Sequence, residues 1–284
     1  MNSVLLMGAV AYDPKVVTIW EGFRRWLTDN DLPFDFVLYS NYERQVTDLV
    51  DGRIHAAWNS PLAALRAERL ARAAGRSVRA AVMRDTDRDL TSVIVVRADS
   101  EIRRLADLKG RTVAVGAVDS PQATLIPLNH LRENGLRPGE DVTVRRFDVG
   151  VGLHGDHIGG ERDAARALAA GQVDAACMID GNHLLFTQEG SLPAQTRILG
   201  QTEPYDHCTM TLIDTAPPEL ADRFTALLLA MSYDDPVVRP LLDLEGLRVW
   251  QDGRTSGYAQ LDAAVDATGF YGPEGQLTAA DYRP

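Results

Sequence analysis

The most constraining stretch of this chain is residues 107–135, which read DLKGRTVAVGAVDSPQATLIPLNHLRENG. An apolar, β-branched run ends at a glycine, and a polar loop then leads into leucines at helical spacing. This order predicts a strand, a loop and a helix, with Ser120 as N-cap and Pro121 at the first helical position. Such a helix start is either an ordinary capped element of an α/β fold or an anion site, because free N–H groups and the helix dipole favour negative charge there.

The chain repeats this unit. Residues 7–14 (MGAVAYDP) and 115–121 (VGAVDSP) each place Gly-Ala-Val before a polar loop that contains proline. Further along, residues 51–58 (DGRIHAAW) echo residues 170–177 (AGQVDAAC), where a helix ends at glycine and a short buried strand follows. The repetition predicts two similar α/β lobes with a cleft between them. Since ligands of open α/β sheets bind at the carboxyl ends of strands, the loops after these strands should face the cleft.

Taken together, these motifs resemble the phosphonate/phosphate-type periplasmic substrate-binding proteins of ABC importers. The resemblance lies in DLKGRTVAVGAVDSPQATLIPLNHL and in GQVDAA after GGERDAARAL, and it spans about residues 5–260 in matching order. It implies an α/β, type II periplasmic-binding-protein (Venus flytrap) fold with a ligand cleft between two lobes. We expect a discontinuous lobe 1 at residues 1–97 plus 204–284 and a lobe 2 at residues 98–203, which carries the anion-binding loop 119–124.

Hydrophobic periodicity completes this outline. The chain should cross between the lobes near residues 91–97 and 203–210, which would act as hinges. Residues 216–284 are expected to form helices that pack on lobe 1, and the polar last dozen residues to be loosely held. After a first strand at residues 4–10, one helical face should be buried, made of Val17, Trp20, Phe23, Trp26 and Leu27.

Composition limits the possible partners and the cellular location. The 284 residues are 45% hydrophobic and 24% charged, as in ordinary globular proteins, and no segment is long and apolar enough for a membrane span. The net charge of −11 argues against nucleic acid, which needs a basic surface. The start, MNSVLLMGAV, lacks a basic region and a long apolar run. As written, the sequence predicts a cytoplasmic protein, and a periplasmic or extracellular one if a signal peptide has been removed.

The resemblance assigns the ligand contacts of the anion-binding loop to Ser120, Gln122 and Thr124. In the family this loop supplies hydroxyl and backbone donors to a phosphonate or phosphate oxygen. The family often has Ser-Thr-Ser here, whereas this chain has Ser-Pro-Gln-Ala-Thr. The resemblance thus implies a small oxyanion ligand, and an ABC permease as partner.

Four further candidates follow strands of lobe 1, where family members place aromatic and polar cleft residues. These are Tyr12, Tyr42, Trp58 and Asn59. The alternative is that the aromatic side chains cover the sheet edge, because large rings are more often part of the core than of a site.

Three candidates lie in lobe 2. Asp180 ends the strand of GQVDAACMID and resembles the family residue that accepts hydrogen bonds from a ligand amine or a protonated phosphonate; alternatively it caps a helix. Arg162 stands where the family commonly has histidine, and a guanidinium can bind phosphate or carboxylate bidentately or lie on the surface. His157, in the glycine-rich loop 150–160, is the third candidate ligand contact.

Histidine and cysteine residues leave a second hypothesis open. His154, Asp156, His157 and Cys208 include metal-ligating types, and His207-Cys208 could form a nucleophilic pair, but neither spacing is a recognised motif. Cys177 and Cys208 are expected to be reduced. We expect no metal, no cofactor and no catalytic residue in a binding protein. The alternative is a cytoplasmic enzyme on the same fold, desulfinase- or decarboxylase-like, that uses Cys208 with a nearby histidine.

Overall fold

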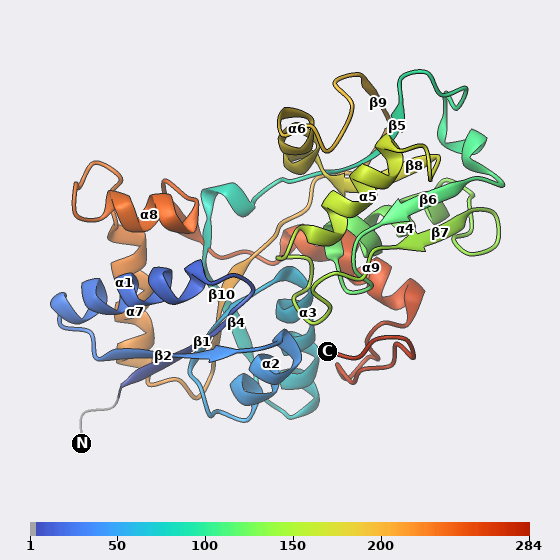
Figure 1. Ribbon diagram of the computed structural model, residues 1–284. Helices are drawn as coiled ribbons and strands as arrows, with labels where there is room; N and C mark the ends of the chain where they lie inside the picture. The colour runs from blue at the N-terminus through green and yellow to red at the C-terminus, as the bar shows by residue number, and fades with distance from the viewer. Residues whose placement is uncertain (1–3) are drawn as a thin grey trace.

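The computed structural model describes residues 4–284 and consists of two α/β lobes, each built on its own sheet (Figure 1). The two-lobed α/β architecture predicted from the repeated unit is confirmed. No helix within residues 4–284 is both long and apolar enough to cross a membrane.

The sheet of lobe 1 has six strands in the order β11-β4-β10-β3-β1-β2. Strand β1 pairs in parallel with β2 and β3, whereas β10 is antiparallel to β3 and β4. The strands are β1 (Leu5–Val10), β2 (Phe34–Tyr39), β3 (Ala56–Asn59), β4 (Val78–Arg84), β10 (Thr209–Ile213) and β11 (Trp250–Asp252). Because β1, β3 and β4 run in the same direction, their carboxyl ends lie at one edge of the sheet.

The sheet of lobe 2 has five strands in the order β7-β6-β8-β5-β9. They are β5 (Ser92–Arg97), β6 (Thr112–Val115), β7 (Thr143–Arg146), β8 (Ala175–Ile179) and β9 (Thr196–Gln201). Strand β5, which we expected at the end of the first lobe 1 segment, instead pairs with β8 and β9. The crossing therefore precedes this strand, and its buried apolar run alone could not indicate which sheet it joins.

Helices flank both sheets. In lobe 1 these are α1 (Lys15–Asp29), α2 (Tyr42–Val50), α3 (Pro61–Ala73), α7 (Pro218–Ala230) and α8 (Arg239–Glu245). Lobe 2 has η2 (Leu105–Leu108), the π-helical turn η3 (Pro121–Leu125), α4 (Ile126–Glu133), α5 (Gly159–Ala169) and α6 (Asp180–Gln188). The chain also forms η1 (Asp85–Asp87), η4 (Ser256–Tyr258) and α9 (Ala259–Thr268). The predicted strand–loop–helix order of residues 107–135 is confirmed.

The buried face of α1 differs by one position from the predicted one. Val17 is 49% exposed and Trp26 only partly buried. The residues that pack into the lobe 1 core are Val16, Ile19, Trp20, Phe23 and Leu27. This spacing follows the helix period more closely than the one we expected, and Trp20 and Phe23 pack against each other with ring centroids 5.3 Å apart.

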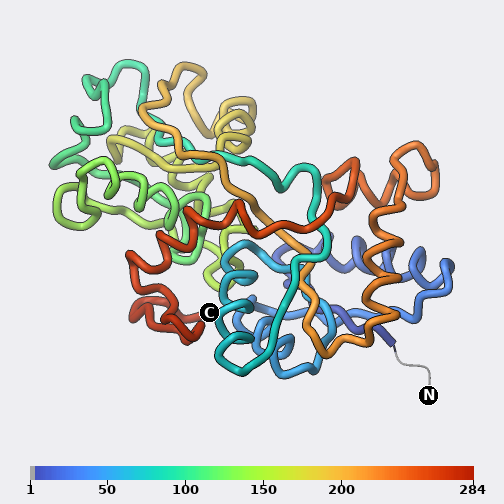
Figure 2. The backbone as a smooth tube through the Cα atoms, turned by 180° about the vertical axis from the view of Figure 1, so that it is seen from behind, coloured from blue at the N-terminus to red at the C-terminus, as the bar shows by residue number. Residues whose placement is uncertain are grey.

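The C-terminal segment joins both lobes. Helices α7 and α8 pack on lobe 1, but α9 lies against α3 of lobe 1 and against η3 and α4 of lobe 2. The tail that follows is anchored, since Tyr282 is fully buried and Asp281 forms an ion pair with Arg146 of β7. Figure 2 shows this red segment running from one lobe to the other.

Two further segments connect the lobes side by side, one between β4 and β5 and one between β9 and β10 (Figure 2). Leu90 and Tyr205 exchange backbone hydrogen bonds of 2.8 Å in both directions, so the two segments form a short bridge. We call residues 85–91 and 202–208 the connections. They lie where the hinge was predicted to within a few residues.

Candidate ligand-binding cleft

The carboxyl ends of strands from both sheets meet at the connections. On lobe 1 these are the ends of β1, β3 and β4, and on lobe 2 those of β6 and β8. Two adjoining cavities open there, each lined by side chains from both lobes. This is the arrangement expected of a ligand cleft in open α/β sheets.

The first, which we call the hinge cavity, has a volume of about 310 Å³. Its lining from lobe 1 and the connections is Tyr12, Arg84, Thr86, Asp87, Leu90 and His207; its lining from lobe 2 is Gln122, Gly155, Asp156, Ile158, Ile179, Gly181 and Asn182. Polar donors and acceptors from both lobes thus converge on one space of small-molecule size.

The second, the α1–α5 cavity, has a volume of about 370 Å³ and shares Tyr12, Asp156 and Ile158 with the first. The beginnings of two helices line it: Asp13 and Lys15 at α1, and the stretch His157–Arg162 at α5. Two helix N-termini, Lys15 and an Arg162 paired with Glu189 favour an anion at this cavity, whereas the carboxylates of Asp13 and Asp156, which also line it, favour a partly protonated or zwitterionic one.

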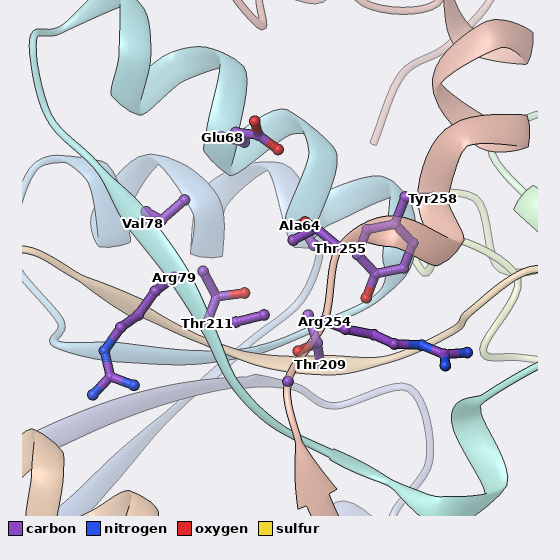
Figure 3. Close-up of a pocket in the computed structure, with 11 residues that line it drawn as sticks. Ala64, Glu68, Val78, Arg79, Thr209, Thr211, Arg254, Thr255 and Tyr258 are labelled. Carbon is purple, nitrogen blue, oxygen red and sulfur yellow. The ribbon is translucent and has the colours of Figure 1, made fainter.

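A third cavity of about 370 Å³ lies on lobe 1 away from the cleft. Figure 3 shows it between Ala64 and Glu68 of α3, Thr209 and Thr211 of β10, and the segment that carries Tyr258. Its Arg254 is bound by Asp206 at 2.6 Å and by Asp89 at 2.8 Å. No side chain from lobe 2 lines this cavity, so it lacks what a closing cleft requires.

The predicted anion-binding loop is buried rather than open. Ser120 is 1% exposed, and its hydroxyl accepts a hydrogen bond from the Ala123 N–H at 3.2 Å, as predicted for an N-cap. Gly155 of the facing loop covers it: a Cβ at this position would lie 2.5 Å from Ser120 Oγ. Its φ of +80° also favours glycine, so this close approach depends on the residue type.

The other two residues of that loop differ in their access to the cleft. Gln122 lines the hinge cavity and donates from Nε2 to the Gly155 carbonyl at 2.9 Å. Thr124 is buried away from both cavities. Gln122 Oε1 and Thr124 Oγ1 have no hydrogen-bond partner among the residues that the structure describes. Of the three predicted residues, Gln122 is the one that faces the cleft.

The lobe 1 candidates separate into a cleft residue and three packed ones. Tyr12 lines both cavities. Tyr42 is buried, donates to Asp156 and stacks on His154 with ring centroids 4.7 Å apart. Trp58 lies in the core against Trp20 and Trp250.

Asn59 is also packed, since its amide donates to Thr211 Oγ1 at 3.0 Å and accepts from Gln45 at 2.9 Å.

In lobe 2, His157 and Arg162 line the α1–α5 cavity, where Arg162 pairs with Glu189 at 2.7 Å. Asp180 is exposed beside the hinge cavity and accepts from the Thr91 hydroxyl at 3.0 Å.

A buried polar cluster holds the lobes together near Tyr42. We call Glu43, Ser60, His154 and Tyr271 the His154 cluster. His154 lies at 2.7 Å from Ser60 Oγ through Nδ1 and at 2.9 Å from Glu43 Oε1 through Nε2. Burial opposes ionisation of Glu43, but the charge of His154 and hydrogen bonds from His154 and Tyr271 outweigh it and lower the pKa of Glu43 to about 2.

A second polar cluster, the His207 cluster, consists of Asp87, Asp156, His207 and Cys208. His207 Nδ1 lies 3.1 Å from Cys208 Sγ and 3.7 Å from Asp87 Oδ1. Burial raises the pKa of the Cys208 thiol well above its usual value, and the charge of Asp156 adds to the effect. A thiol held protonated is the opposite of an activated nucleophile, so the catalytic reading of Cys208 with His207 gains no support.

Sequence reasoning missed Arg84, which contributes a cation to the hinge cavity. Arg84 binds Asp87 through two hydrogen bonds of 2.5 and 2.9 Å, and it also pairs with Glu245 at 3.4 Å. Burial raises the pKa of Glu245 to about 7. The available signal was the polar sequence Arg84–Asp87 directly after a predicted strand, a position that faces the cleft in this fold.

Comparisons with known proteins agree with this geometry. The family described as "ABC transporter, phosphonate, periplasmic substrate-binding protein" matches residues 8–265. The structure of PhnD1 from Prochlorococcus marinus in complex with methylphosphonate superposes with a TM-score of 0.69 at 15% identity, covering 94% of this chain and 98% of that one. XAC2383 from Xanthomonas citri bound to ATP gives 0.69 at 17% identity, covering 93% and 96%.

The aliphatic sulphonate binding protein SsuA from Escherichia coli gives a TM-score of 0.54 at 17% identity, covering 94% of this chain and 84% of that one. At such identities these neighbours establish the fold. The predicted two-lobed periplasmic-binding-protein fold is confirmed.

Proposed function

The chain belongs to the phosphonate family of periplasmic substrate-binding proteins of ABC transporters, and on that premise we propose that it captures a small oxyanion in the cleft between its lobes. The family implies a small-molecule ligand and a permease partner, and its members are normally exported to the periplasm. We accordingly propose that this chain acts at the outer face of a membrane, where it delivers the oxyanion to a permease.

The observation that carries the proposal is the α1–α5 cavity. It combines the first turns of two helices with Lys15 and Arg162, and it is lined from both lobes. Lys15 forms no ion pair with any residue between 4 and 284 that the structure describes. A ligand bound here would contact both lobes, so its binding would favour the closed arrangement.

The proposed contacts follow from this placement. Lys15 and Arg162 would bind the anion, with His157 at the same cavity and Tyr12 at the wall that the two cavities share. Gln122 would reach the ligand from the hinge cavity through its donor Nε2, which binds the Gly155 carbonyl at 2.9 Å in this structure. Ser120 and Thr124 support the loop that carries Gln122. Asp180 stays a predicted contact at the rim.

A ligand panel tests the function. The purified protein is heated with phosphate, phosphite, alkylphosphonates, aminoalkylphosphonates, sulfonates and sulfinates, and the ligand is recovered afterwards. At a concentration one hundred times its Kd, a true ligand adds about 2.7 kcal/mol of stability, which is a clear shift in Tm. We expect at least one oxyanion to stabilise the protein and to be recovered unchanged. No shift across the panel, or consumption of the ligand, would overturn the proposal.

A charge substitution tests the site. Lys15→Ala should weaken the binding of the oxyanion identified by the panel roughly tenfold or more, because a charge-assisted contact contributes about 1.5–3 kcal/mol. The matched control is Lys109→Ala, which removes the other lysine of the chain, paired with Asp141 at 3.6 Å away from both cavities. Equal affinities in both variants, measured by titration calorimetry, would mean that the ligand binds outside the α1–α5 cavity.

A further inference from the structure

The His207 cluster brings together the side-chain types that bind zinc-like cations. The ligand atoms of Asp87, His207 and Cys208 all lie within 4.8 Å of one another, and all three residues are buried. Asp156 of the other lobe lies beside this group of three, with Oδ1 3.9 Å from Cys208 Sγ, and would complete a fourth position by a small approach of its side chain. In a tetrahedral site with bonds of about 2.0–2.3 Å, neighbouring ligand atoms are roughly 3.3–3.7 Å apart, close to the spacings found here.

The backbone holds these side chains in place. The His207 N–H donates to the Asp87 carbonyl at 2.8 Å, which ties the two connections together at the cluster. The Tyr258 hydroxyl donates to the His207 carbonyl at 2.8 Å. A site whose ligands are already positioned loses less conformational freedom when it binds a cation.

Outer contacts of the kind seen around protein metal sites are also present. Arg84 holds the Asp87 carboxylate through two hydrogen bonds, and the Tyr42 hydroxyl donates to Asp156 Oδ2. Such partners orient ligating carboxylates and leave the second lone pair of each oxygen for a cation. Asp87, Asp156 and His207 line the hinge cavity, which provides an entry path.

The charge balance of the cluster also favours a cation. Arg84 is shared between Asp87 and Glu245, whereas Asp156 has no ion pair with any lysine or arginine that the structure describes. Carboxylates gathered in a partly dry space repel one another, and a divalent ion offsets that repulsion most effectively. Histidine, thiolate and carboxylate together suit Zn²⁺ better than Mg²⁺ or Ca²⁺, which prefer oxygen ligands only.

We propose that Asp87, His207, Cys208 and Asp156 form a binding site for a zinc-type divalent cation at the junction of the two lobes. Three ligands come from the connections on the lobe 1 side, and Asp156 comes from the glycine-rich loop of lobe 2. A bound cation would therefore link the lobes and favour their closed arrangement. The cation site needs no anion, and its ligands are not the proposed oxyanion contacts, although Asp156 also lines the α1–α5 cavity.

Cobalt titration of the full chain tests the proposal, because Co²⁺ reports thiolate ligation directly by absorption. Protein freed of metal with a chelator is titrated with Co²⁺ and then with Zn²⁺. We expect one equivalent to produce a thiolate-to-cobalt charge-transfer band, and Zn²⁺ to remove the band by displacement. Absence of that band in the unaltered protein would overturn the proposal whatever the variants do.

The second cysteine provides a matched control. Cys208→Ser should abolish the charge-transfer band, whereas Cys177→Ser, which alters a fully buried thiol in the lobe 2 core, should leave it intact. A band that persists in Cys208→Ser would place the cobalt elsewhere and refute the site.

Asp156→Asn tests the link between the lobes and leaves the lobe 1 ligands untouched. It should weaken Co²⁺ binding at least about tenfold and reduce the Tm increase that Zn²⁺ gives to the unaltered protein. Unchanged affinity in this variant would contradict the four-ligand site. Because the titrations contain no oxyanion, they succeed or fail separately from the ligand panel.

Discussion

The His154 and His207 clusters use the same residue types at the same junction, yet their surroundings differ. In the His154 cluster both ring nitrogens have partners, at 2.7 and 2.9 Å, and the imidazole has no exposed surface. The His207 cluster instead lines a cavity of about 310 Å³ and places a thiol and two carboxylates around one imidazole. The first imidazole is thus buried with both nitrogens paired, whereas the second cluster borders a cavity that a ligand could enter.

This difference shows why residue types alone do not identify a site. A serine, a histidine and a glutamate in mutual contact resemble a catalytic triad, but complete burial leaves no space for a substrate. What distinguishes the His207 cluster is access, because Asp87, Asp156 and His207 line the hinge cavity whereas His154 has no exposed surface. We therefore assign the His154 cluster to holding the lobes together and the His207 cluster to binding.

The largest effect on stability is expected from His154→Ala. This change removes the hydrogen bonds to Ser60 and Glu43 and leaves the buried Glu43 carboxylate with Tyr271 as its remaining hydrogen-bond donor in the cluster. Removing one partner of buried hydrogen-bonded polar groups costs about 1–3 kcal/mol for each group left short of a partner, and more for a charged one, so we expect a loss of roughly 3 kcal/mol, measured by urea unfolding at neutral pH. The control is His157→Ala, an exposed histidine of the same loop, which should change stability by less than about 0.5 kcal/mol. Equal effects would show that the His154 cluster does not hold the lobes.

A smaller loss of stability is expected when the pH is lowered. The pKa of Glu43 is lowered from 4.5 in the unfolded chain to about 2 in the folded one, so the folded state favours the ionised carboxylate. This stabilisation is complete above pH 4.5 and is lost as the pH falls toward 2. At 1.36 kcal/mol per pKa unit, about 2 kcal/mol of this stabilisation should be lost by pH 3.

Glu43→Gln isolates that contribution. The stability difference between the unaltered protein and this variant should be constant between pH 6 and 8 and should shrink by about 2 kcal/mol at pH 3. A difference that does not change with pH would mean that His154 does not stabilise a charged Glu43, and the contrast between the two clusters would lose its basis.

Local sequence signals were enough for the elements and the lobes. The run at residues 112–115, the cap at Ser120 and Pro121 at the helix start all depend on neighbouring residues, and the structure has them as predicted. The repeated Gly-Ala-Val unit likewise indicated two lobes, because each copy is a complete local signal.

Contacts between segments that are distant in the sequence could not be predicted from such local signals. Gly155 covers Ser120 from 35 positions away, and Asp156 meets Cys208 from 52 positions away. The glycine-rich loop around His154 takes positive φ values at Gly152 and Gly155, and the sequence of the loop alone does not specify this path. Sequence reasoning therefore named candidate residues, while tertiary packing decided which of them line the two cavities.

The smallest effect is expected from Ser120→Ala. This variant tests whether Ser120 supports the packing of its loop or contacts the ligand. Loss of the cap hydrogen bond to the Ala123 N–H should cost about 1 kcal/mol of stability, measured by urea unfolding. Affinity for the oxyanion should stay within about twofold, because Gly155 separates the hydroxyl from both cavities. A large loss of affinity with the same loss of stability would instead mean that the glycine-rich loop leaves Ser120 when ligand binds. The ligand would then occupy the helix start itself, and the loop that carries His154 and Asp156 would be the part that moves.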